Sequence, residues 1–171
     1  MNCLKKKVKN NKAKVAGLTI GLVTVGYFIG NTPTEIEANI EALEMVDRVI
    51  HSHCFSGAWL NSKVDESQLN GLTKEKALFL IQTIPVKLNL EAYRANNNTI
   101  GYTYKSRDTI WFNRRFHDDF NVCEKSANLA HEIHGHKNGF THETKATARR
   151  KRSAPYVIGD IVKYCCEKDL K

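Results

Sequence analysis

Apolar residues recur at helical spacing in the first long segment that follows Pro33. In residues 34–54 they stand three or four positions apart and so share one face of an α-helix: Ile36, Ile40, Leu43, Val46 and Ile50. Thr34 is the expected N-cap, because acidic residues follow it in the first turn. Residues 61–71 are polar and predict a loop, and a second, shorter helix is expected over 73–84, beginning at a Thr73 cap.

The pattern then changes to strict alternation in "VKLNLEAY", residues 86–93, which predicts a half-buried strand. Two further strand candidates, residues 100–104 and 109–116, follow a turn and are separated by four polar residues. A helix is expected from about Cys123 to Gly139. Helices, a small antiparallel or mixed sheet and another helix make an α+β fold, and the sequence has no internal repeat.

Charge and hydropathy set the N-terminus apart. The net charge is +8, but six lysines fall within residues 1–14, which leaves about +2 for the rest of the chain. The uncharged residues 15–30 follow; as a helix they would span roughly 24 Å, less than a bilayer core of roughly 30 Å. Residues 1–33 therefore predict an export signal or a membrane anchor, with a buried helix as the alternative, and residues 34–171 a single exported domain.

The charge distribution argues against a nucleic-acid-binding protein, because the excess lies in the predicted signal. The basic run "ARRKR", residues 148–152, is interpreted as a solvated loop.

Four cysteines follow the N-terminal segment, an even number that suits an oxidising compartment: Cys54, Cys123, Cys165 and Cys166. A bridge between the adjacent pair would strain the backbone. A Cys54–Cys123 bridge is the favoured pairing, and reduced, buried thiols are the alternative.

Four of the seven histidines fall within "SANLAHEIHGHKNGFTH", residues 126–142. A helical zinc motif usually has two histidines four residues apart, with a glutamate after the first. Here the steps are three, to His134, and five, to His136, counted from His131. In a regular helix the five-residue step turns the rings about 140° apart, whereas a π-type turn brings them to one side. Gly135 is consistent with backbone that deviates there, and His134 remains the alternative ligand.

"HEIHGH" resembles the HExxGH motif of the dipeptidyl peptidase III family of zinc peptidases, and "HKNGFTH" has the HxxGxxH spacing of the metzincins. Over roughly residues 100–160 the chain also resembles small exported bacterial zincin-like proteins. This resemblance implies a zincin-like fold with the motif on one helix, and His131, His136 and His142 as ligands of Zn²⁺.

Three imidazoles leave the fourth zinc position to water, and Glu132 would act as general base in the hydrolysis of a peptide or protein substrate. Tyr156, in a "SAPY" turn expected beneath the metal, would donate to the oxyanion or approach the zinc; a core or turn residue is the alternative. Residues 109–116 are expected at the sheet edge, where an extended peptide could pair. The predicted function is a zinc metallopeptidase, and the alternative is a non-catalytic zinc-binding protein, either a degenerate zincin or a metal-buffering histidine tract.

Overall fold

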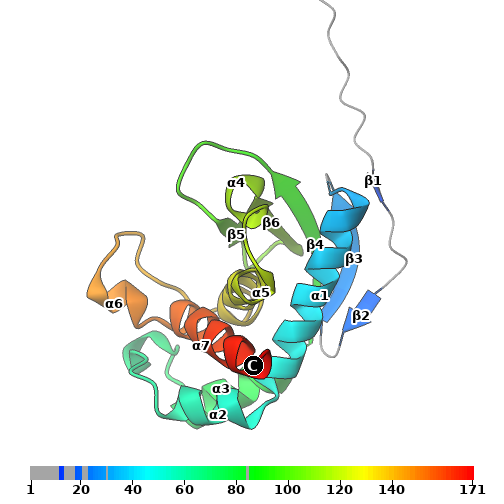
Figure 1. Cartoon of the computed structure of the whole chain (residues 1–171). Helices are drawn as coiled ribbons and strands as arrows, with labels where there is room; N and C mark the ends of the chain where they lie inside the picture. Colours follow the sequence, from blue (N-terminus) through cyan, green and yellow to red (C-terminus); the bar gives the residue numbers. More distant parts are fainter. Residues whose placement is uncertain (1–11, 14–17, 21–22, 30, 84) are drawn as a thin grey trace, which may run out of the picture.

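The computed structural model describes residues 12–13, 18–20, 23–29, 31–83 and 85–171, and its fold is α+β, as predicted (Figure 1). A small mixed sheet packs on helices, and the elements in chain order are β1 (Lys12–Ala13), β2 (Leu18–Ile20), β3 (Val23–Ile29), α1 (Pro33–Ile50), α2 (His53–Leu60), η1 (Glu66–Gln68), α3 (Lys74–Thr83), β4 (Val86–Tyr93), β5 (Gly101–Thr103), β6 (Thr109–Asn113), α4 (Arg114–His117), α5 (Val122–Ala130), η2 (His131–Lys137), α6 (Ala148–Lys151) and α7 (Ala154–Asp169).

The strands lie in the order β1-β3-β4-β6-β5, with β2 also paired to β3. β4 is parallel to both β3 and β6, whereas β5 is antiparallel to β6. The prediction that residues 109–116 form the edge is therefore wrong, because β6 lies between β4 and β5. The last three of these residues belong to α4, since the Asn113 side chain accepts a hydrogen bond from the Arg115 N–H and caps that helix.

One face of the sheet is covered by helices. The alternation expected in residues 86–93 is confirmed, because Leu88 and Leu90 are fully buried, and Ile110 and Phe112 of the neighbouring β6 are buried with them. α5 lies in the middle of the molecule and packs against both α1 and α7 (Figure 1). The residues that follow α5 are thereby held between the sheet and α7.

Side-chain caps fix where the first helices begin. The N-cap of α1 is Thr32 and not Thr34: the Thr32 hydroxyl accepts from the Glu35 N–H, and the Glu35 side chain accepts from the Thr32 N–H. Pro33 at the first helical position favours this earlier start, because its φ suits a helix and its missing N–H would have no partner there. The predicted Thr73 cap is confirmed, since its hydroxyl accepts from the Lys76 N–H.

The apolar residues 15–30 do not form the expected helix where the structure describes them. Residues 18–20 and 23–29 are the strands β2 and β3, and Val25 of β3 lies opposite Leu88 of β4. Many of these residues are β-branched, which favours strand over helix. Across the described residues, no helix is long and apolar enough to cross a membrane. Export and the boundary at residue 33 stay predictions, and residues 1–11 lie outside the described part of the chain.

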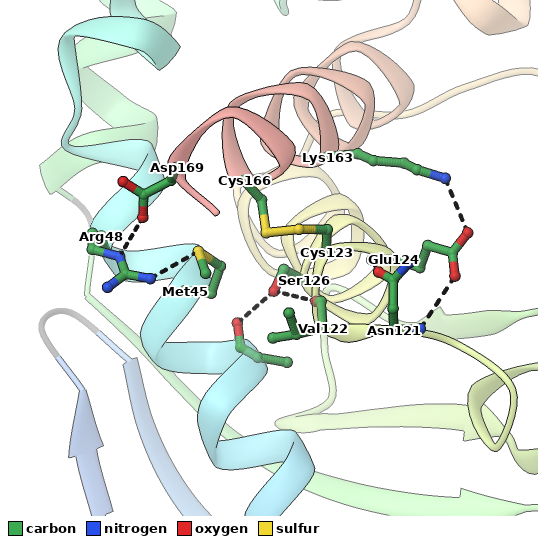
Figure 2. Close-up of a disulfide and its surroundings, with 11 residues drawn as sticks. Met45, Arg48, Asn121, Val122, Cys123, Glu124, Ser126, Lys163, Cys166 and Asp169 are labelled. Atoms are coloured by element: carbon green, nitrogen blue, oxygen red, sulfur yellow. Dashed lines mark hydrogen bonds and ion pairs between the residues drawn. A yellow bond between two sulfur atoms is a disulfide. The ribbon is translucent and has the colours of Figure 1, made fainter. Parts of the chain in front are cut away.

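Two disulfides hold α7, and neither is the favoured Cys54–Cys123 pair. Cys165 bonds to Cys54 of α2, with Cα atoms 6.0 Å apart. Cys166 bonds to Cys123 of α5, with Cα atoms 5.5 Å apart, as Figure 2 shows. Successive helical residues point about 100° apart, so the adjacent cysteines of α7 reach different neighbours. The predicted pairing is wrong because it did not consider that Cys165 and Cys166 could each bond to a different helix. The bridges suit an oxidising compartment.

A hydrogen bond to α1 also holds the start of α5. The buried Ser126 hydroxyl lies 3.0 Å from the carbonyl oxygen of Ala42 in α1 and 2.7 Å from that of Val122 (Figure 2). Together with the Cys123–Cys166 bridge, these contacts fix the helix that leads into the histidine segment.

Candidate metal centre

The histidine segment begins as a regular α-helix and then widens. Asn121 and Glu124 form a capping box at the start of α5. From His131 to Lys137 the chain is π-helical, which confirms the predicted π-type turn. The wider turn brings His131 and His136 to the same side, with ring centroids 5.1 Å apart.

Two glycines shape this turn in different ways. Gly139 has a φ of +87° and ends the helical segment, as predicted. Gly135 lies inside the π-helical segment, so the backbone deviates there as predicted, although its φ is not positive. It is also needed for packing, because a Cβ atom there would lie 2.7 Å from the Cβ of Pro155 and 2.8 Å from its Cα.

Three histidines converge: His131, His136 and His142 each offer one nitrogen, and these atoms all lie within 4.8 Å of one another. His142 reaches the pair from beyond Gly139, with ring centroids 5.4 Å from His131 and 4.9 Å from His136. No other such group occurs in the part of the chain that the structure describes. These are the three ligands that the sequence motif implied.

Backbone carbonyls orient all three rings. The Nδ1 atom of His136 lies 3.1 Å from the Phe140 oxygen, and that of His142 lies 2.9 Å from the Glu143 oxygen. His131 hydrogen-bonds in the same way to the backbone of Pro155. A ring that donates one N–H to a carbonyl keeps a lone pair on its other nitrogen, as metal-binding histidines do.

Burial keeps these rings neutral. It lowers the pKa of His131 to about 3, and the neighbouring His136 and His142 act in the same direction. Burial also lowers the pKa of His136 and of His142. Near neutral pH the group is therefore in the form that binds a cation.

His134 does not join the group. It is fully buried in the core, where burial lowers its pKa to about 4 against the opposing effect of the Ile81 backbone in α3. The alternative in which His134 is the second ligand is not the arrangement found, because the three converging nitrogens belong to the other histidines.

Glu132 lies in the same cavity as the three histidines. The cavity has a volume of about 640 Å³; β5 lines one side, and the start of α7 with Tyr156 lines another. Glu132 is only 2% exposed, and burial raises its pKa to about 8 while a hydrogen bond from the Thr103 backbone of β5 opposes the rise. The strand edge and this carboxyl group are thus fixed relative to each other.

Tyr156 is in the first turn of α7, not in the expected turn beneath the metal. Its ring centroid lies 4.7 Å from that of His131, with the planes at 90°, and 5.0 Å from that of His142. Pro155 at the start of α7 favours helix from that point, which explains the difference.

Sequence reasoning missed Arg150, which was placed in a solvated loop. Residues 148–151 form the short helix α6, and the Arg150 guanidinium lies 4.9 Å from the centroid of the Tyr156 ring. Arg150 lines the cavity. The sequence could not single out Arg150, because nothing in the basic run of residues 148–152 distinguishes it from the neighbouring arginines.

The three histidines could hold one metal ion of the kind that imidazole nitrogens favour, in a cavity that also contains the carboxyl group of Glu132. Comparison of the chain with models of protein families, with curated proteins and with solved structures finds no match.

Proposed function

We propose that the chain is a zinc-dependent hydrolase of peptide bonds with a zincin-like fold. The observation that carries the proposal is the convergence of His131, His136 and His142 beside the buried carboxyl group of Glu132, in a groove bounded by an edge strand.

The donor set fits Zn²⁺. Three neutral imidazoles, each oriented by a backbone carbonyl, match the three protein ligands that catalytic zinc sites use while one position stays open. Bound there, zinc polarises a carbonyl group and lowers the pKa of water.

Glu132 is the proposed general base, which accepts a proton from the attacking water and later passes it to the leaving amine. The Thr103 backbone holds its carboxyl group at the cavity. A nearby cation favours the ionised form of a carboxyl group, as this role requires. Tyr156, whose ring packs on His131 and His142, is the proposed donor to the oxyanion that develops in the substrate.

The edge strand is the proposed substrate platform. Among the described strands β5 pairs only with β6, and its residues line the cavity, so its other edge can offer backbone groups besides the Thr103 group that bonds Glu132. An extended peptide can add there as a further strand, which lays its backbone across the histidines.

The test compares the full-length wild type with Glu132→Gln, loaded with zinc, for metal content and for cleavage of a mixed peptide library. Glu132→Gln should keep one zinc and lose at least about a hundredfold in rate, the usual contribution of a general base. Glu124→Gln is the matched control: this carboxylate also lines the cavity but is paired with Lys163, and glutamine can replace it in the capping box. Zinc binding without any cleavage by the wild type would favour the non-catalytic alternative.

A further inference from the structure

Arg150 is held in a fixed position at the side of the groove. Its guanidinium lies 4.9 Å from the centroid of the Tyr156 ring, and its Nη1 donates to the Thr144 carbonyl at 2.9 Å. The Tyr156 ring in turn packs on His131 and His142. The Tyr156 ring therefore lies between the Arg150 guanidinium and the histidine site.

The charge of Arg150 is not neutralised by the protein. No described carboxylate forms an ion pair with it: Glu143, on the same loop, accepts from the Thr147 hydroxyl at 2.6 Å and lies 3.5 Å from Arg149. The Arg150 Nε is buried and, within the described residues, has no hydrogen-bond partner. A buried donor without an acceptor is unfavourable, so a ligand that supplies one gains free energy.

The other cationic side chain that lines the groove differs in this respect. Lys163 lies 3.0 Å from the carboxylate of Glu124, which neutralises it. Asp160 of α7 also lines the cavity, but its charged neighbours are Lys151 and Lys163. Among the described residues, Arg150 is therefore the cationic side chain of the cavity that has no ion-pair partner.

We propose that Arg150 binds a carboxylate group of the peptide substrate and determines specificity on the Tyr156 side of the histidine site. A planar guanidinium presents N–H groups in the geometry that a carboxylate accepts, and stacking on Tyr156 keeps that plane oriented. The carboxylate comes either from the C-terminus of the peptide or from an acidic side chain. This inference rests on the proposed function only in taking a peptide as the ligand. It does not require that the peptide be hydrolysed.

Binding is measured with the full-length, zinc-loaded Glu132→Gln protein, which should bind peptides without cleaving them. Fluorescent peptides of one sequence are compared in three forms: a free C-terminus, a C-terminal amide, and a C-terminal amide with one internal glutamate. Arg150→Gln and Arg150→Lys are made in the same background, and zinc content and melting temperature verify that each is folded. Arg149→Gln is the matched control, because Arg149 is exposed and pairs with Asp65 and Glu143.

We expect one of the two carboxylate forms to bind about tenfold or more tightly than the neutral amide, as a charge-assisted hydrogen bond allows. Arg150→Gln should abolish the difference, Arg150→Lys should keep part of it, and Arg149→Gln should leave it unchanged. The form that binds tightly identifies the source of the carboxylate.

Equal binding of all three peptides, no binding of any, or a preference that survives Arg150→Gln would overturn the inference. Hydrolysis by the wild type is scored separately: cleavage without a carboxylate preference refutes only the role of Arg150, and a preference without cleavage refutes only the proposed hydrolysis.

Discussion

Gly135 and Pro155 are so close that a Cβ atom on Gly135 would lie 2.7 Å from the Cβ of Pro155. The two residues join the π-helical segment to the first turn of α7. Because Pro155 also accepts a hydrogen bond from His131, and Tyr156 follows it directly, this contact sets the spacing between the histidines and the aromatic ring. The geometry of the histidine site therefore depends on Gly135, although Gly135 contributes no side chain to it.

Gly135→Ala should push η2 and α7 apart. We expect the free energy of unfolding to fall by about 1–3 kcal/mol, the usual range for an overpacked core position, and zinc to bind more weakly. Denaturant titration of the apo protein and competition with a chelator measure the two effects.

Gly57→Ala is the control for that change. Gly57 lies within α2, and a Cβ atom there would meet nothing within 4 Å. Its replacement should leave stability unchanged or raise it by about 0.5–1 kcal/mol, since alanine is the better helix former. If Gly135→Ala were equally harmless, the close packing at Pro155 would not matter.

The two disulfides predict a distinctive tryptic digest under non-reducing conditions. Cleavage after lysine and arginine gives one peptide with Cys54 (residues 49–63), one with Cys123 (116–125) and one with both Cys165 and Cys166 (164–168). Because Cys165 and Cys166 bridge to different helices, all three peptides should remain linked as one species in the mass spectrum. A two-peptide species joining 49–63 to 116–125, with 164–168 free, would instead support the pairing that the sequence favoured.

The sequence predicted the elements that carry a strong local pattern. Alternation placed the strand at residues 86–93, and the five-residue histidine step required the wider turn found at His131–Lys137. Both signals depend only on which side of a regular backbone a side chain faces. The set of three histidines was implied by the resemblance to zinc-peptidase motifs, because His142 lies beyond Gly139, where helical periodicity no longer applies.

Features that depend on tertiary contacts were not predictable in this way. The edge position of β5 follows from strand order, which alternation does not encode. The disulfide pairing depends on how α2 and α5 lie beside α7. Arg150 reaches the site only because α6 folds back toward Tyr156, and a run of basic residues contains no sign of that.

His117 should make folding sensitive to acid. It is buried against Phe112 and Phe120, its Nε2 lies 2.8 Å from the Asn128 Oδ1, and burial lowers its pKa to about 4, with Asp118 and Lys125 as its charged neighbours. Between about pH 6.5 and pH 4 the unfolded chain binds a proton at this residue that the folded chain does not. Stability therefore rises with pH across this window, by on the order of 3 kcal/mol, and is lost on acidification.

His117→Gln isolates this effect, because the glutamine amide can still donate to Asn128 but does not titrate. The stability of the wild type relative to the variant, measured by denaturant titration, should fall by on the order of 3 kcal/mol between pH 7 and pH 4. Parallel curves would show that His117 does not contribute.

His131, His136 and His142 are proposed to hold one zinc ion together. The most direct measurement is the zinc content of the full-length protein and of single variants, determined by mass spectrometry after removal of loosely bound metal. We predict one zinc per chain in the wild type, and loss of it in His131→Ala, His136→Ala and His142→Ala. His134→Leu should keep the metal, because His134 is buried in the core and outside the group. Loss of zinc from His134→Leu with retention in His136→Ala, or no stoichiometric zinc in the wild type, would contradict the account.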